Sequence, residues 1–290
     1  MRRYVRALAS PLSRRQARYH LAVRYRVYRP RSPLSACVDY FWSMSEAPPH
    51  ASERVVPSGA MELVFNLTDH ELRIAGSVRR IPGAIVSGCY SSPFPVDTRL
   101  HAAMVGVHFK PGGAAGLFGV APGELANTHV DLEVLWGRQA LELRERLHAA
   151  ANVHERFLIL EHALSSWLAR ARDPRGAVKH ALTELDRPRI DIGRVSRELS
   201  LSRRRFIEIF TEDVGMTPKR YARVRRFQRA LAAAMASSPP RWAELALACG
   251  YFDQAHLIRD FRQFAGMTPV EFQRSRLPDG SGVIDGAAHS

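Results

Sequence analysis

The spacing of hydrophobic positions changes along the chain, and this change predicts two kinds of structure. In the first part, short apolar runs alternate with polar positions and are separated by prolines and glycines. In one such run, Met61 and Leu63 share one face of a strand, while Val64 and Asn66 lie on the other. Alternation with a period of two is typical of a half-buried antiparallel strand. We therefore expect a β-rich domain over 23–130.

Helical spacing replaces this alternation from about residue 131. Leucines and tryptophans recur on one face over 131–173, which predicts two amphipathic helices that link the domains or form a dimer. The run Asp173-Pro174-Arg175-Gly176 ends the pattern, because proline and glycine interrupt a helix. We place a domain boundary there.

A repeated pattern occupies residues 174–277, and its matching positions are 51 residues apart. Phe210 and Gly215-Met-Thr-Pro218 in the first copy return as Phe261 and Gly266-Met-Thr-Pro269 in the second. Each copy predicts a helix, a tight turn and a second helix. One long helix of about five turns is expected between the copies. The chain is therefore expected to be of the α+β class, with an all-α C-terminal domain of two helix-turn-helix units.

The expected helix ends carry residues that satisfy free backbone groups. Asp191, Ser202 and Asp253 each precede a helix and can accept a hydrogen bond from an unpaired N–H. Thr217 and Thr268 also fit as cap residues, since each is followed by a proline at the first helical position. The caps support the predicted boundaries independently of the apolar pattern.

Two such units on one stiff spacer can place two helices in successive major grooves, about 34 Å apart on one face of B-DNA. These second helices are predicted over 202–212 and 253–264. Arginine suits guanine, glutamate suits cytosine and glutamine suits adenine, while further arginines suit phosphates. The outward side chains expected to contact DNA are Arg203, Arg204, Arg205, Glu208, Gln254, Ala255, His256, Arg259 and Arg262.

The distribution of charge favours the same interpretation. The chain has 290 residues and a formal net charge of +14, and 174–277 hold 20 basic but only 11 acidic residues. Clustered arginine neutralises phosphates and releases counterions, so we expect a polyanionic partner; a solvated basic face is the alternative. The spacer helix carries Lys219 and five arginines, some of which should face phosphate. Residues 1–22 are expected to form a disordered basic arm and 278–290 a flexible tail.

Because of these motifs, the stretch from about Ala177 to Arg276 resembles the DNA-binding domain of the AraC/XylS family of bacterial transcription regulators. The resemblance implies double-stranded promoter DNA as a partner, an activator role and contact with RNA polymerase. Two positions depart from the family pattern: Ser200 stands where the turn usually has glycine, and Phe252 where a small polar residue is common. The base contacts that the resemblance implies fall on Arg204, Glu208, Gln254, Ala255 and Arg259.

The N-terminal half resembles, less closely, the β-rich sensor domain of some members of that family, through motifs such as Tyr40-Phe-Trp42. This resemblance implies a cupin-like barrel or sandwich with a helical extension, and it leaves a small-molecule effector and a homodimer open as partners. An effector pocket mixes aromatic groups with a few polar groups. The residues expected to line it are Trp42, Glu62, Asn66 and His108, although packing in the core is the alternative for most of them.

Catalytic and metal-binding signatures are missing from the sequence. The glycine-rich Pro111-Gly-Gly-Ala-Ala-Gly116 lacks the Gly-Lys-Ser/Thr ending of a phosphate loop, and neither GxSxG nor HExxH occurs. His101, His108 and His129 do not have the close spacing of a metal site. We therefore expect no enzyme activity, no cofactor and no metal.

The three widely spaced cysteines form no CxxC pair, and no apolar run reaches the ~18 residues of a membrane span. These features favour a cytoplasmic protein without a membrane partner. The expected function is a sequence-specific, effector-responsive transcription regulator that reads two adjacent major grooves. The alternative is a ligand-binding module with secondary or nonspecific DNA binding.

Overall fold

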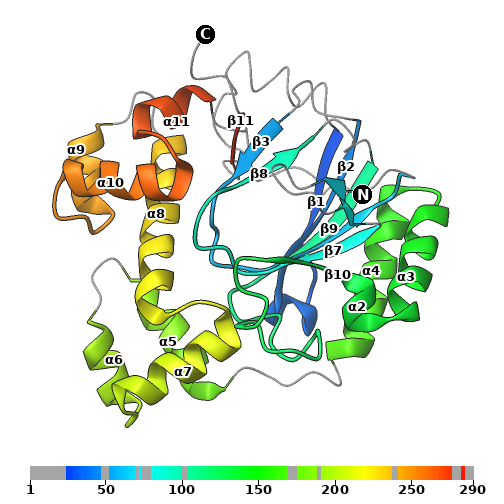
Figure 1. Ribbon diagram of the computed structural model, residues 1–290, viewed down its shortest axis with the longest axis horizontal. Coiled ribbons are helices and arrows are strands. Elements are labelled where there is room, and N and C mark those ends of the chain that lie inside the picture. Colours follow the sequence, from blue (N-terminus) through cyan, green and yellow to red (C-terminus); the bar gives the residue numbers. More distant parts are fainter. Residues whose placement is uncertain are drawn as a thin grey trace.

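The computed structural model describes residues 24–46, 52–68, 72–73, 80–81, 83–98, 103–168, 175–187, 191–236, 241–275 and 282–284. The N-terminal part is β-rich and the C-terminal part is helical, as predicted (Figure 1). The expected basic arm, residues 1–22, lies outside the described residues.

A six-stranded antiparallel sheet forms the centre of the N-terminal domain. Its strands lie in the order β1-β2-β9-β4-β7-β10. They comprise β1 (Arg24–Tyr28), β2 (Val38–Ser45), β4 (Glu62–Asn66), β7 (Ala84–Ser87), β9 (Ala103–Phe109) and β10 (His129–Asp131). A short 3-10 helix, Leu34–Ala36, precedes β2. The order places strands that are far apart in sequence side by side, so residues of one functional site can come from several of them.

Strand β4 is buried on both faces, so the expectation of a half-buried strand is wrong. Leu63 and Phe65 are fully buried in the main core. Val64, on the opposite face, is only 6% exposed. The reason is a second apolar cluster on that face, which Val64 forms with Met44, Ile85 and Met104.

The C-terminal tail contributes a strand, so the expectation of a flexible tail over 278–290 is wrong for residues 282–284. Strand β11 (Gly282–Ile284) pairs antiparallel with β3 (Ser52–Val55), whose other edge pairs with β8 (Phe94–Asp97). The open edge of β3 presents unpaired N–H and C=O groups, and the tail satisfies them. A two-stranded ribbon of β5 (Leu72–Arg73) and β6 (Arg80–Ile81) completes the described strands.

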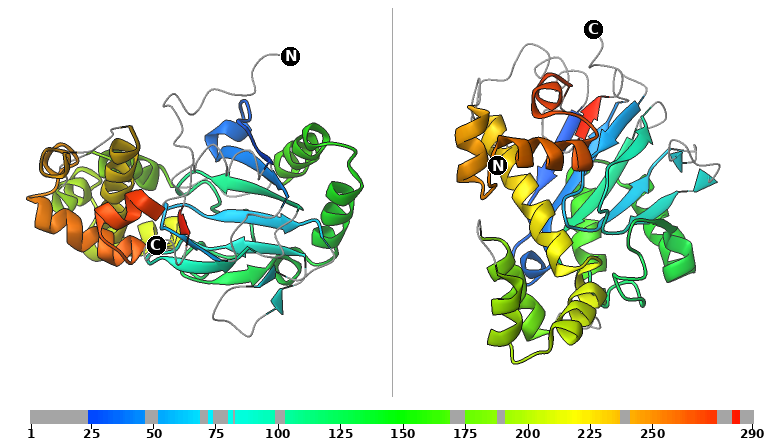
Figure 2. Two further views of the ribbon diagram at one scale, coloured as in Figure 1. Left: turned by 90° about the horizontal axis from the view of Figure 1, so that it is seen from above. Right: turned by 60° about the vertical axis from the view of Figure 1, so that its left-hand side comes forward.

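Three helices cover the sheet on the side away from the C-terminal domain (Figures 1 and 2). They are α2 (Leu132–Trp136), α3 (Arg138–Ala149) and α4 (Val153–Leu168). Two helices were expected here, but Gly137 has a φ of +56° and divides the first into α2 and α3. Phe157 of α4 stacks on Phe41 of the sheet, with ring centroids 6.3 Å apart.

The C-terminal domain has the predicted double helix-turn-helix order. Its helices are α5 (Gly176–Leu185), α6 (Ile192–Glu198), α7 (Arg203–Val214), α8 (Pro218–Ala236), α9 (Trp242–Ala248), α10 (Gln254–Ala265) and α11 (Pro269–Ser275). Asp191, Ser202 and Asp253 cap α6, α7 and α10 as predicted. Ser200 in the first turn has a left-handed φ of +54°, which fits the glycine usually found there.

Helix α8 forms the common core of both units. Tyr221 packs edge-to-face on Phe210 of α7, with centroids 5.5 Å apart. Phe227 contacts Phe261 and Phe264 of α10 at 5.1 and 5.3 Å. These five rings are buried, so burial of aromatic surface fixes both helix-turn-helix units to one rod.

The same helix also packs on the N-terminal domain. Gln228 donates from Nε2 to the carbonyl of Pro57 at 2.6 Å. Gly59, with a φ of +81°, permits the close approach, since a Cβ there would lie 3.3 Å from the Tyr221 ring. The backbone N–H of Gly123 donates to the Glu212 carbonyl near the end of α7, at 3.3 Å. The two domains are therefore in contact along α7 and α8.

His129 is a buried titratable group at the edge strand β10. It is 6% exposed, and its ring lies 4.9 Å from the rings of both Tyr90 and Phe94. Neither ring nitrogen has a hydrogen-bond partner within the described part of the chain. Burial lowers the pKa of His129 from 6.5 to about 4, and the Glu62 carboxylate only partly opposes this shift.

Replacing His129 with phenylalanine should reduce the acid sensitivity of the fold. The unfolded chain takes up a proton at His129 below about pH 6.5, whereas the folded chain does so only near pH 4. The neutral His129 therefore contributes fully to the free energy of unfolding above pH 6.5, and this contribution is lost as the pH falls toward 4. The free energy of unfolding should fall by about 2–3 kcal/mol between pH 7 and about 4.5. Urea unfolding at these two pH values should show this loss in the wild type and a smaller one in His129→Phe. The matched control is His180→Phe at an exposed histidine, which should keep the wild-type loss. An equal loss in wild type and His129→Phe would contradict a buried, neutral imidazole at His129.

Candidate functional site

Helix α7 presents a basic face at its N-terminal half. Arg203, Arg204, Arg205 and Glu208 are all exposed, as predicted, while Phe206 is fully buried. Arg204 Nε donates to Glu208 Oε1 at 2.9 Å, and Arg205 Nη1 lies 3.5 Å from the other oxygen. The hydrogen bond from Arg204 lowers the pKa of Glu208, so this carboxylate is ionised at neutral pH. The face therefore offers guanidinium donors together with one acceptor, which suits base edges and phosphates.

Helix α10 presents the corresponding face of the second unit. Gln254, Ala255, Arg259 and Arg262 are exposed, as predicted. Leu257, Phe261 and Phe264 of the same helix are fully buried. The amphipathic division leaves the amide of Gln254 and the guanidinium of Arg259 on the outside, where they can donate to bases.

His256 differs from the other residues expected to contact DNA. It is half-buried between α10 and α8, where Nη2 of Arg226 lies 3.0 Å from its Nε2. A guanidinium only donates, so Nε2 is the acceptor and the imidazole is neutral. Burial, and then the charge of Arg226, lowers the pKa of His256. Tyr251 contacts the ring edge-on at 5.2 Å. His256 therefore has a structural contact that the outward-facing pattern did not predict.

A buried carboxylate anchors each of the two exposed helices, and the sequence analysis missed both. Asp260 of α10 has no exposed surface and accepts from Arg223 Nη2 at 2.6 Å and Arg226 Nη2 at 3.1 Å. Asp213 of α7 is equally buried and accepts from the backbone N–H and Nη1 of Arg175, at 3.1 and 2.8 Å. The available signal for Asp260 was its position directly beside the buried Phe261 on the inward face, whereas Asp213, between Glu212 and Val214, has no aromatic neighbour in sequence. Buried charges in proteins are paired, so each aspartate marks an arginine contact.

The spacer helix α8 uses its arginines within the protein. Besides the two that bind Asp260, Arg225 and Arg229 reach Asp186 at the end of α5, at 2.8 and 3.5 Å. Arg220 donates to the carbonyl of Ser91. All five guanidinium groups thus have partners within the protein, while Lys219 is exposed, and contact of this helix with phosphate stays a prediction.

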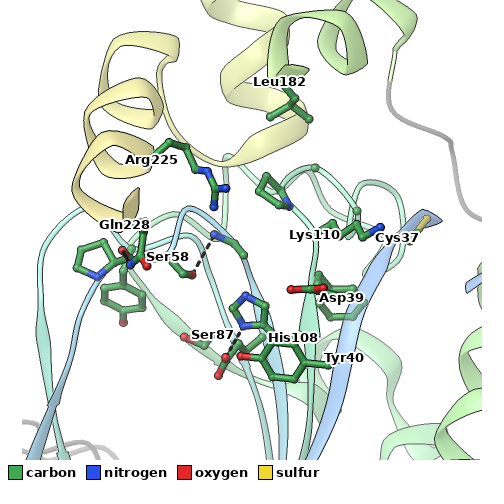
Figure 3. Close-up of a pocket in the computed structure, with 18 of the residues that line it drawn as sticks. Cys37, Asp39, Tyr40, Ser58, Ser87, His108, Lys110, Leu182, Arg225 and Gln228 are labelled. Atoms are coloured by element: carbon green, nitrogen blue, oxygen red, sulfur yellow. Dashed lines mark hydrogen bonds and ion pairs between the residues drawn. The ribbon is translucent and has the colours of Figure 1, made fainter. Parts of the chain in front are cut away.

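A cavity of about 1050 Å³ lies between the sheet and helices α5 and α8 (Figure 3). Tyr40, Glu62 and His108 line it from the sheet, and Thr183 and Gln228 line it from the helices. His108 Nδ1 lies 2.6 Å from Glu62 Oε1. The imidazole also stacks on Tyr40, with ring centroids 4.8 Å apart and planes within 5°.

Strand register explains which of the expected pocket residues meet. Tyr40 pairs with His108 across β2 and β9, and His108 pairs with Glu62 across β9 and β4. Trp42 is two residues further along β2, where it packs on Gly106 beside the second apolar cluster. Asn66 is fully buried, and its Oδ1 accepts from the backbone N–H and hydroxyl of Thr68 at 3.0 and 2.8 Å. The cavity therefore includes Glu62 and His108 but neither Trp42 nor Asn66.

The cysteines offer no sign of nucleophilic chemistry at two of their three positions. Burial raises the pKa of Cys89 to about 12 and also raises the pKa of Cys249. Both are therefore neutral thiols at neutral pH, and a thiol is a poor nucleophile.

The described part of the chain contains neither a metal-binding cluster nor a membrane-spanning helix. No group of three or more His, Cys, Asp or Glu side chains is placed there to hold a metal ion. None of the helices in that part of the chain has both the length and the apolar surface needed to cross a bilayer. His101, one of the three histidines considered for a metal site, lies outside the described residues.

Two protein families match separate parts of the chain. Residues 195–275 match the family described as "Helix-turn-helix domain", and residues 26–131 match "Domain of unknown function (DUF6597)". The first match covers both exposed helices and the spacer between them. The second covers most of the sheet.

Three solved structures resemble all or part of the chain at low identity and low TM-score. The C-terminal domain of AraT, a response regulator from Geobacillus stearothermophilus, is 17% identical with a TM-score of 0.34, over 37% of this chain and 90% of that chain. A DNA-binding transcriptional dual regulator from Escherichia coli K-12 is 24% identical with a TM-score of 0.28, over 33% and 90%. ToxT from Vibrio cholerae is 12% identical with a TM-score of 0.44, over 87% and 97%. No curated protein matches the chain significantly.

Removing the carboxylate of Asp260 is expected to destabilise the second unit. Asp260→Ala would leave two partly buried guanidinium groups without their counter-charge, which should cost on the order of 3 kcal/mol of unfolding free energy. The exposed Arg259 on the same helix provides a matched control, since Arg259→Ala should change stability by less than about 0.5 kcal/mol. Urea unfolding followed by circular dichroism measures both changes. Equal stability of the two variants would show that Asp260 does not anchor α10.

Proposed function

We propose that this chain is a DNA-binding transcription regulator with an AraC-type helix-turn-helix domain. It reads two adjacent major grooves, and a small ligand controls this binding. The observation that supports this most directly is the pair of exposed basic helices, α7 and α10, packed on one spacer helix. Four arginines of α8 pair with Asp260 or Asp186, whereas the arginines at the N-terminal half of α7 and Arg259 and Arg262 of α10 are exposed on the helices that can enter grooves.

The length of the spacer fits this function. Helix α8 has 19 residues, and a helix of that length spans about 28 Å. Successive major grooves on one face of B-DNA are about 34 Å apart. The packing of α7 near the start of α8 and of α10 further along it keeps the two helices from moving independently. One molecule can therefore bind two short boxes in a fixed register.

Base recognition is assigned to residues that are both exposed and suited to groove chemistry. Arg204 and Glu208 of α7 already contact each other, and in a groove they would exchange this contact for guanine and cytosine. Gln254 and Arg259 of α10 suit adenine and guanine. The remaining exposed arginines, Arg203, Arg205 and Arg262, suit phosphates, which position the protein without specifying sequence.

The cavity provides a route by which a small ligand could control DNA binding. Its walls come from both domains, and Gln228 and Arg225 of α8 line it together with residues of the sheet. A ligand that contacts both walls would favour one arrangement of the domains over others, and this difference in affinity is what shifts a conformational equilibrium. The His108–Glu62 pair offers a polar anchor beside an aromatic ring.

Selection of random duplex DNA by the full-length protein tests the paired reading. The bound pool should converge on two short boxes about one helical turn apart. For a duplex carrying both boxes, Arg204→Ala and Arg259→Ala should each weaken binding by ~1–3 kcal/mol, with specificity relaxed at one position in one box. Arg138→Ala, which removes an exposed arginine from α3 in the other domain, should change neither property. Equal weakening of specific and random DNA by Arg204→Ala and Arg259→Ala would contradict base reading and would favour the alternative of secondary, nonspecific binding.

Filling the cavity tests the proposed control by a ligand. A metabolite panel would be screened for compounds that raise the melting temperature of the protein and change its affinity for the selected boxes. Thr183→Trp, from the cavity wall, should abolish both effects, because the indole occupies the ligand volume. His180→Trp, on the same helix but outside the cavity, should retain them. A compound that acts equally on both variants would bind elsewhere, and the absence of any active compound would remove this part of the proposal.

A further inference from the structure

Phe252 is the most exposed of the large hydrophobic side chains in the described ranges, at 85%. It lies in the turn between α9 and α10, directly before Asp253, the cap residue of α10. An aromatic ring left in water gives up the free energy that its burial would supply, so a partner that covered this ring would gain that free energy. The sequence departs from its family resemblance at this same position.

The turn holds the ring outward. Gly250 adopts a left-handed φ of +85°, and the backbone N–H of Tyr251 donates to the Ala246 carbonyl at 2.9 Å. Tyr251 is 3% exposed, and the guanidinium of Arg226 lies 4.5 Å from its ring centroid. Because the backbone and Tyr251 are fixed in this way, the neighbouring Phe252 remains on the solvent side.

The exposed ring lies beside the part of α10 that would enter a groove. A recognition helix presents its N-terminal residues to base edges. Phe252 precedes the exposed Gln254 and Ala255 and is three residues before Ala255, which in turn is four before Arg259. Phe252 is not itself helical, because Asp253 between it and the first helical residue, Gln254, is extended. The ring therefore lies at the N-terminal end of α10, the end that the proposed function places against base edges.

Thymine is the base that fits an apolar side chain in the major groove. It alone among the four standard bases carries a methyl group there, and phenylalanine and alanine are among the side chains that contact it. We propose that Phe252 reads the 5-methyl group of a thymine at the edge of the box bound by α10. The inference rests on the proposed entry of α10 into the major groove, and it adds a specificity contact by an apolar ring to the polar contacts of Gln254 and Arg259.

Deoxyuridine tests this contact, because it differs from thymidine only by lacking the methyl group. Each thymine of the selected α10 box would be replaced by deoxyuridine, one at a time, and the Kd of the full-length protein would be measured at fixed salt. One replacement should weaken wild-type binding by roughly three- to tenfold, the effect of losing one buried methyl contact. Phe252→Ala should weaken binding to the thymine duplex by a similar factor and should bind the thymine and uracil duplexes equally.

Two further variants make the outcome specific. Val134→Ala removes another exposed apolar side chain, 77% exposed on α2 in the other domain, and should keep the wild-type preference for thymine. Arg259→Ala reports separately whether α10 lies in the groove. If Arg259→Ala relaxes specificity while no uracil replacement matters, the thymine contact is overturned and the proposed function stands. If neither the uracil replacements nor Arg259→Ala changes specificity, the proposed entry of α10 into the major groove is contradicted.

A protein partner for Phe252 is the competing explanation, and the same variants distinguish it. Leu247 on α9 is also 60% exposed and would belong to such a surface. Loss of transcription in Phe252→Ala at unchanged Kd and unchanged thymine preference would overturn the DNA contact. Circular dichroism should give the wild-type melting temperature for this variant, since the ring is not part of the core.

Discussion

Neutralisation of the arginines on helix α8 is the constraint on which the arrangement of the DNA-binding domain depends. A half-buried guanidinium without a counter-charge is costly, so each arginine fixes the element that supplies its partner. Asp260 thereby ties α10 to α8, and Asp186 ties the end of α5 to the same helix. The aromatic contact of Tyr221 with Phe210 adds α7. Because α8 uses this charge internally, it is the scaffold on which α7 and α10, the two helices proposed to contact DNA, are packed.

The same helix connects the DNA-binding domain to the sheet. Gln228 donates a hydrogen bond to the carbonyl of Pro57, and Tyr221 packs on Gly59. A displacement of the sheet would therefore also move α8, on which both helix-turn-helix units are packed. The cavity borders this contact (Figure 3). A ligand there and DNA on the opposite helices would therefore act on one common element, which is the physical requirement for coupling between two sites.

Local chemistry was predictable from the sequence, whereas contacts set by tertiary register were not. The caps at Ser202 and Asp253 follow from short-range rules and were confirmed. The row of Tyr40, His108 and Glu62 depends on the pairing of three strands from distant segments, and period-two alternation gives the face of each strand but not its register. Trp42 therefore packs beside the second apolar cluster rather than lining the cavity, which agrees with the alternative of core packing. The partners of the α8 arginines were equally inaccessible, because a basic helix has the same pattern whether its charges face phosphate or buried aspartate.

The central claim is that α8 holds two groove-reading helices at a fixed separation, and a spacing series tests it most directly. The affinity of the full-length protein would be measured at fixed salt for duplexes in which one to about ten base pairs are inserted between the two selected boxes. A stiff spacer predicts a single optimum and loss of the second box's contribution after insertion of about five base pairs, half a helical turn. Affinity that stays constant across all insertions would show that the two units bind independently and would contradict the account.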